Sequence, residues 1–127
     1  MALPYRGEKD PDLRIEAIHV LGMMGGQSEL VDMAKSEKDP KVRLALIRSL
    51  GMTGKPSDAL TSMYNTETDA SIRKEIVKSM FMQQNAKGLI ELARKETNPE
   101  MRKELVQKLS TMRSKEATDY MMEVLNK

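Results

Sequence analysis

Apolar residues recur along this chain at intervals that favour α-helices, and the same pattern of apolar and polar positions appears four times. Each copy opens with a polar residue suited to a helix start, namely Asp10, Asp39, Asp69 or Asn98. These four starts lie 29, 30 and 29 residues apart. A period of this length is typical of proteins in which small helical units stack side by side.

The first helix of each copy carries the clearest signals. An Asp or Asn side chain can accept hydrogen bonds from the free N–H groups that begin a helix, and a proline follows in three of the four copies, where its missing N–H costs nothing. The positions 3, 7, 8 and 11 residues after each start are apolar and share one helix face, which we expect to be buried. These positions are Leu13, Ala17, Ile18 and Leu21, then Val42, Leu46, Ile47 and Leu50, then Ile72, Ile76, Val77 and Met80, and finally Met101, Leu105, Val106 and Leu109.

A turn and a shorter second helix are predicted to follow in each copy. Neither helix of a pair can bury its apolar face alone, so neighbouring pairs must stack. The expected apolar positions of the second helices are Leu30, Val31, Met33 and Ala34, then Ala59, Leu60, Met63 and Tyr64, then Leu89, Ile90, Leu92 and Ala93, and finally Met121, Met122, Val124 and Leu125.

The predicted fold is an all-α solenoid of about four repeats and about eight helices. We expect one domain at 10–127 after an irregular lead-in at 1–9, with repeats at about 10–38, 39–68, 69–97 and 98–127. Nothing helical is predicted before the first repeat. Its N-terminal face should therefore be partly uncovered, unless the lead-in or a missing upstream repeat covers it. Self-association through this face is a further expectation.

The repeat motif is Asp-Pro-x-apolar-Arg followed by an apolar helix that ends Leu-Gly. It is complete at 10–14 with Leu21-Gly22 and at 39–43 with Leu50-Gly51, whereas the third copy departs at Ala70 and Phe81 and the fourth at Ser110. Over 10–127 the chain resembles the HEAT-like repeats of bacterial proteins, including those named after phycobilin lyases. The resemblance implies an armadillo-like helical scaffold that binds proteins and is not an enzyme.

Composition narrows the function classes. The net charge of +2, from 21 basic and 19 acidic residues, and the absence of Trp disfavour nucleic acid, because neither a basic surface nor stacking platforms are indicated. The absence of Cys excludes disulfides and thiolate metal sites. No apolar run approaches the about 20 residues needed to span a membrane. For localisation, the cytoplasm is favoured, and a bacterial periplasm stays open if an upstream signal was removed.

Two sets of residues invite a chemical interpretation. His19 is the only histidine and occupies a polar column, without a partner that would make it catalytic or metal-binding. Arginines recur one turn into each first helix and suggest either phosphate binding or a structural ladder to carboxylates or carbonyls of adjacent repeats, of which we favour the ladder. The ladder is expected to comprise Arg14, Arg43, Arg73 and Arg102 with Asp10, Asp39, Asp69 and Asn98.

The second helices are the better place for a partner, because the curvature of stacked repeats turns one row of helices into a concave surface. The predicted function is a non-enzymatic protein-interaction scaffold without cofactor or metal. A binding or regulatory repeat domain of a larger enzyme is the first alternative, and nucleic-acid binding is the second. The candidate partner-binding residues are Asp32, Lys35, Thr61, Tyr64, Asn65, Glu91, Arg94, Asp119 and Glu123.

Overall fold

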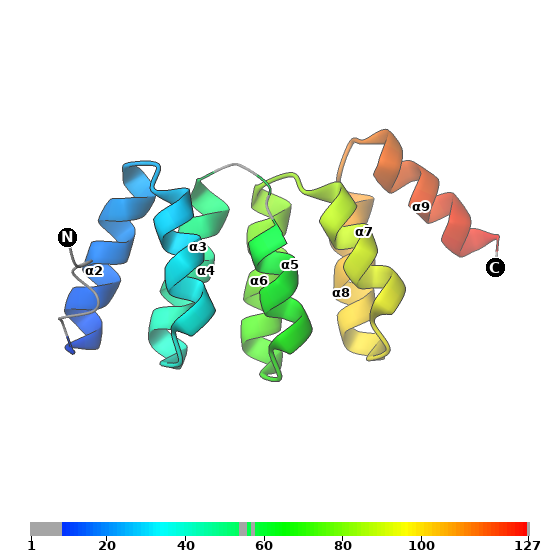
Figure 1. Cartoon of the computed structure of the whole chain (residues 1–127). Helices are drawn as coiled ribbons and strands as arrows, with labels where there is room; N and C mark the ends of the chain where they lie inside the picture. Colours follow the sequence, from blue (N-terminus) through cyan, green and yellow to red (C-terminus); the bar gives the residue numbers. More distant parts are fainter. Residues whose placement is uncertain (1–8, 54–55, 57, 127) are drawn as a thin grey trace.

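Paired helices stacked in a row make up the computed structural model, which describes residues 9–53, 56 and 58–126. The described residues form eight α-helices and no strand, and the predicted all-α solenoid is confirmed. The first helices lie side by side in one row, and the second helices form a parallel row in front of them (Figure 1). The helices are α2 (Pro11–Met23), α3 (Gln27–Ser36), α4 (Pro40–Met52), α5 (Asp58–Thr66), α6 (Ala70–Met82), α7 (Ala86–Lys95), α8 (Pro99–Ser110) and α9 (Lys115–Leu125).

The predicted helix starts are confirmed by the capping geometry. Asp39 accepts the backbone N–H of Lys41 at 2.9 Å, and Asp69 accepts that of Ser71 at 2.8 Å. Asp10 and Asn98 cap α2 and α8 in the same way. The predicted lead-in at 1–9 lies outside the described residues apart from Lys9, and so do two residues, 54 and 55, of the turn after α4.

The core lies between the two rows and is most complete in the middle of the stack. Leu46, Ile47 and Leu50 of α4 are fully buried, as are Ile76 and Met80 of α6. The predicted apolar face is therefore confirmed for these two helices.

The same face is only partly covered at the N-terminal end. Leu13 is 55% exposed, whereas its counterparts Val42, Ile72 and Met101 are buried. No described helix packs on the outer side of α2, so the prediction that Leu13 belongs to the core is wrong.

The predicted apolar face of the fourth second helix is also wrong in part. The buried residues of α9 are Ala117 and Tyr120, while Met122 and Leu125 are 53% and 76% exposed. Met121 is half-buried against the core. No described helix follows α9, which also tilts away from the row (Figure 1). Among the described residues, no helix covers its far side.

Two glycines allow neighbouring first helices to approach closely. A Cβ atom added at Gly22 would lie 3.3 Å from the Cβ of Ser49, and one added at Gly51 would lie 2.8 Å from the Cβ of Ser79. Ser49 and Ser79 are both buried. At the corresponding position α6 carries Phe81, and α6 packs less extensively on α8 than α4 does on α6. The Gly-Ser contacts therefore set the tight spacing of the first three repeats.

Gly51→Ala should destabilise the protein, although alanine favours helices. The new Cβ would also lie 3.0 Å from the Cα of Ser79, a backbone atom that cannot move aside cheaply. Overpacking costs about 1–3 kcal/mol, and the gain in helix propensity is about 1 kcal/mol. We expect a net loss of up to about 2 kcal/mol in urea denaturation. The matched control is Gly22→Ala, which meets only a side chain closely and should be neutral or stabilising; the reverse order of the two variants would refute the close-packing argument.

Candidate protein-binding surface

The arginine row forms ion pairs with glutamates at the junctions between repeats. Arg43 Nη2 lies 3.1 Å from Glu67 Oε1, and Arg73 Nη2 lies 2.8 Å from Glu96 Oε1. Arg14 pairs with Glu37 in the same way. The glutamate side chains are shielded, with exposed fractions of 4%, 11% and 4% for Glu37, Glu67 and Glu96.

The expected pairing of these arginines with the capping residues is therefore corrected. A short Asp or Asn side chain lies next to the N–H groups of its own helix start, and Asp39, Asp69 and Asn98 are used in this way. The longer glutamate side chain, placed two residues earlier, reaches the arginine. Arg102 of the fourth copy is exposed, and within the part of the chain that the structure describes it forms no ion pair.

Each junction glutamate also holds the loop that connects two repeats. Glu37 Oε2 accepts the backbone N–H groups of Lys38 and Asp39 at 3.1 and 3.0 Å. Glu67 and Glu96 bind the two residues after them in the same way. One carboxylate thus fixes both an arginine of the first helix and the backbone that leads to the next cap.

Tyr64 belongs to this ladder: its expected burial on the apolar face of the second helix is confirmed, and its assignment to the partner-binding surface is wrong. Its side chain is 2% exposed, and its hydroxyl group donates to Glu96 Oε1. The guanidinium of Arg73 lies 4.2 Å from the centre of the Tyr64 ring, a cation–π contact. Burial, together with the adjacent Glu96 carboxylate, raises the pKa of Tyr64 well above its ordinary range.

The Glu96 carboxylate is stabilised in its charged form. Burial acts against the charge, but the hydrogen bond from Tyr64, the backbone N–H groups of Asn98 and Thr97, and the charge of Arg73 outweigh it and lower the pKa of Glu96. The three arginines Arg14, Arg43 and Arg73 are thus committed to internal carboxylates, an arrangement that stabilises the stack and leaves little for a phosphate.

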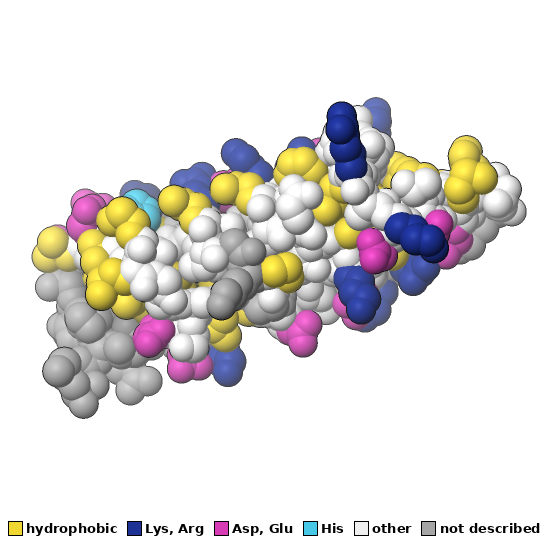
Figure 2. Space-filling view, turned by 90° about the horizontal axis from the view of Figure 1, so that it is seen from above, with side chains coloured by type: hydrophobic (Ala, Val, Ile, Leu, Met, Phe, Trp, Pro, Cys, Tyr) yellow, Lys and Arg dark blue, Asp and Glu magenta, His cyan; other side chains and the backbone are white. Residues whose placement is uncertain are grey.

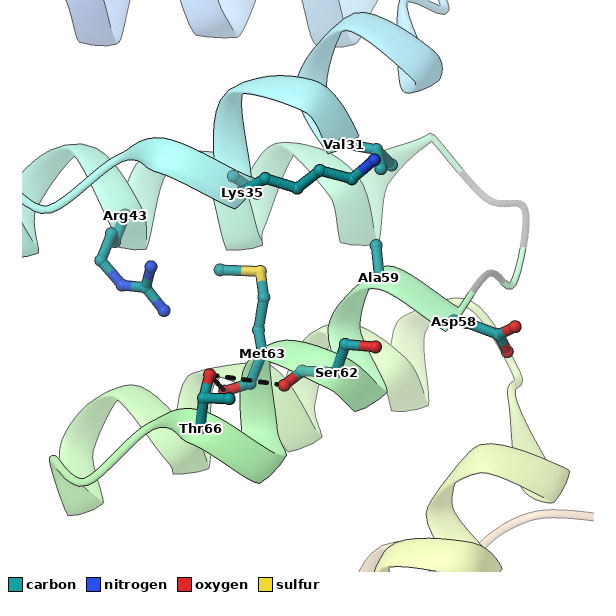
Figure 3. A pocket seen from close by; sticks show the side chains of 9 residues that line it. Val31, Lys35, Arg43, Asp58, Ala59, Ser62, Met63 and Thr66 are labelled. Carbon is teal, nitrogen blue, oxygen red and sulfur yellow. Dashed lines mark hydrogen bonds between the residues drawn. The ribbon is translucent and has the colours of Figure 1, made fainter.

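A groove lies between the second helices α3 and α5, with a volume of about 480 Å³. Its walls are Val31 and Ala34 from α3 and Ala59 and Met63 from α5. Figure 3 shows Lys35 extended along the α3 side, with Met63 rising from α5 opposite it. Polar contacts at its rim include the Thr66 hydroxyl group, which lies 3.3 Å from the Met63 carbonyl oxygen. The groove combines these apolar side chains with charged ones around it, namely Lys35, Arg43 and Asp58.

Two further grooves continue along the row of second helices. One, of about 380 Å³, lies between α5 and α7 and includes Thr61 and Glu91. The other, of about 400 Å³, lies between α7 and α9, where Arg94 bridges to Glu123 at 2.8 Å. Asp119 also lines this last groove.

The nine predicted surface residues fall into three groups. Six line the grooves, namely Lys35, Thr61, Glu91, Arg94, Asp119 and Glu123, although Thr61 is largely buried and its expected exposure is therefore wrong. Asp32 and Asn65 are exposed on α3 and α5 but line none of these grooves; Asp32 lies 3.7 Å from Lys35. Tyr64 is buried, as described above.

The sequence interpretation missed the apolar walls of the α3/α5 groove because it assigned their residues to the core. Val31 and Ala59 are only half-buried, which leaves part of each side chain facing the groove. The available signal is that both are apolar but lie at the margin of the buried helix face. The junction glutamates were missed as well, although a glutamate stands two residues before the caps Asp39, Asp69 and Asn98.

His19 is exposed, as expected for the outer row. Among residues 9–53, 56 and 58–126, no three His, Cys, Asp or Glu side chains gather closely enough to hold a metal ion. The helices of the described part are all too short or too polar to cross a membrane. The arrangement provides a row of partly apolar grooves on a stack that is held together by the arginine–glutamate ladder.

Comparison with known proteins adds one finding. A family model described as HEAT repeats matches residues 3–80, which is more than half of the chain. Searches of curated proteins and of solved structures gave no match.

Proposed function

The chain belongs to the family of HEAT repeats, and on this premise we propose that it is a non-enzymatic scaffold that binds a protein or peptide along its second helices. HEAT repeats are generally protein-interaction scaffolds. Within the family, we place the chain among the bacterial repeats of the phycobilin-lyase type, because of its Asp-Pro-x-apolar-Arg motif. We also propose that 10–127 acts as one domain.

The observation that carries this proposal is the series of grooves between successive second helices. A partner segment lying across α3 and α5 would place an apolar side chain against Ala59 and Met63 and a carboxylate near Lys35. Further along, the acidic residues Glu91, Asp119 and Glu123 of the α7/α9 groove are already paired with basic side chains, so this groove offers polar contacts more than net charge. The rigid ladder behind the grooves would keep them at fixed separations, so little ordering entropy is lost on binding.

The partner can be defined by its chemistry with a random peptide display library selected against the protein. We expect enriched peptides to contain an apolar residue beside Asp or Glu. Their affinities would then be measured by fluorescence anisotropy on three variants. Ala59→Trp fills the α3/α5 groove, Lys35→Glu reverses its rim charge without touching the core, and Gln107→Trp alters an exposed residue of a first helix and is the control.

Both groove variants should weaken binding by about tenfold or more, while the control binds as the wild type does. Circular dichroism checks that each variant is folded. Equal binding by the wild type and Lys35→Glu, or enrichment of no peptide at all, would contradict the proposal.

The same surface would serve if the chain is the binding or regulatory repeat domain of a larger enzyme, an alternative that the length of the full reading frame tests. Nucleic-acid binding is disfavoured further by the engagement of Arg14, Arg43 and Arg73 with internal glutamates. It predicts retardation in a low-salt gel shift that disappears as salt is raised.

A further inference from the structure

Exposed methionines occupy one repeated position at the ends of the first helices. Met23, Met52 and Met82 are the last residues of α2, α4 and α6, and they are 75%, 66% and 51% exposed. Met24, beside the first of them, is 76% exposed. The fourth copy has Thr111 at this position, so the row is confined to the first three repeats. We call Met23, Met52 and Met82 the methionine row.

The methionine row does not contribute to the core, unlike the buried Met33, Met80 and Met101. Figure 2, which looks onto the ends of the helices, shows hydrophobic side chains following one another across this face. Solvated helix ends are ordinarily polar, and an apolar row repeated in register is a feature of interaction sites. Methionine suits such a site because its flexible, polarisable side chain adapts to a partner.

Basic side chains lie beside the methionine row along one edge of this face. Four residues earlier, on the same helix faces, stand His19, Arg48 and Lys78, all exposed. Lys and Arg side chains accordingly border one edge of the face seen in Figure 2. Arg48 is paired with Glu75 at 2.6 Å and His19 is neutral at pH 7, so Lys78 is the cation of these three that is most open to a partner.

The spacing of the row fits a helix. Packed helices lie about 8–10 Å apart, and seven residues of an α-helix rise about 10.5 Å. A helix laid across the ends of α2, α4 and α6 would therefore meet successive methionines with residues one heptad apart. Its carboxylates, on the side facing the first helices, would lie near Lys78 and the basic edge seen in Figure 2.

We propose that the methionine row is a second docking surface, which binds an acidic amphipathic helix of a protein partner. It lies on the ends of the first helices, whereas the grooves lie between second helices. The two sites are independent, and the failure of one leaves the other standing.

The test uses the full chain with ¹³C-labelled methionine methyl groups and three synthetic peptides of about 20 residues. One peptide is an acidic amphipathic helix with Leu at every seventh residue and Glu on the polar face. The second carries Lys in place of Glu, and the third carries Ser in place of Leu. We expect the acidic amphipathic peptide to shift the methyl signals of Met23, Met52 and Met82, to leave those of Met33, Met80 and Met101 unmoved, and to gain helicity.

The triple variant Met23→Gln, Met52→Gln and Met82→Gln should bind this peptide about tenfold more weakly or worse, without loss of stability, because these side chains are exposed. Leucine at the same three positions should retain binding. Lys78→Glu should weaken it by a smaller factor. Unchanged affinity in the glutamine variant, equal binding of the lysine peptide, or binding to anionic lipid vesicles without binding to the acidic peptide would each overturn the proposal.

Discussion

Replacing Glu96 with alanine should lower the free energy of unfolding by about 1–3 kcal/mol, the range for leaving buried hydrogen-bonding groups without a partner. The Glu96 side chain is 4% exposed and accepts four hydrogen bonds. Its loss would leave the buried Tyr64 hydroxyl group and the partly buried Arg73 guanidinium without their acceptor, whereas the exposed backbone N–H groups of Thr97 and Asn98 can bind water. Leaving buried groups unpaired costs more than the pair itself contributes. We therefore expect a larger effect than for an exposed ion pair.

A suitable control is Glu91→Ala on the same helix. The Glu91 side chain is 54% exposed, and its partner Lys95 lies 3.6 Å away one helical turn later. Such a pair contributes only a few tenths of a kcal/mol, so this variant should stay within about 0.5 kcal/mol of the wild type. Urea denaturation of both variants measures the difference. Similar losses for Glu96→Ala and Glu91→Ala would show that the junction glutamates do not hold the stack together.

The free energy of unfolding at acid pH gives an independent measure of the contribution of the same carboxylate. Since the pKa of Glu96 is lowered from its ordinary value of 4.5, the unfolded chain takes up a proton at a pH where the folded protein does not. The stabilisation by Glu96 is therefore fully present above the ordinary pKa of 4.5 and is lost as the pH falls through the lowered pKa of the folded protein. Glu96→Gln should lose stability less steeply than the wild type below about pH 4.5.

The sequence predicts the fold well because its strongest signals are local. Asp39 caps the helix that starts at the next residue, and the apolar positions of α4 and α6 follow from the helical period alone. The ends of the stack were predicted less well. Leu13 and Met122 have the right spacing for a core face, but whether a helix face is buried depends on a neighbouring repeat that local patterns do not describe.

The site was predicted only in part, because it depends on contacts between residues far apart in the chain. The sequence identifies Arg43 and Arg73 as a repeated feature, but it offers many carboxylates as partners. The ones used lie 24 and 23 residues further on. From the sequence, Tyr64 is an apolar residue or a surface anchor. Its hydrogen bond to Glu96, 32 residues away, is evident only from the structure. Apolar residues such as Val31 could not be divided between core and groove without the position of α5.

Truncating Leu50 to alanine should cost about 2–5 kcal/mol, the range for a leucine removed from a closely packed core. Leu50 is fully buried in α4, which is covered by α2 on one side and by α6 on the other. The surrounding helices are held at fixed spacing by the contacts of Gly22 and Gly51, so they cannot collapse easily into the space left behind. The loss should therefore include a cavity contribution as well as the lost hydrophobic burial.

Leu13→Ala is the matched comparison, because it makes the same chemical change at a residue of α2 that is 55% exposed. Its cost should be below about 1 kcal/mol, since little apolar surface returns to water and no cavity forms. Urea denaturation with equal slopes for both variants would show that the difference lies in the folded state. A loss below a few tenths of a kcal/mol for Leu50→Ala would mean that the face of α4 is misassigned. A large loss for Leu13→Ala would mean that another part of the chain, or a second copy, covers the N-terminal face of the solenoid.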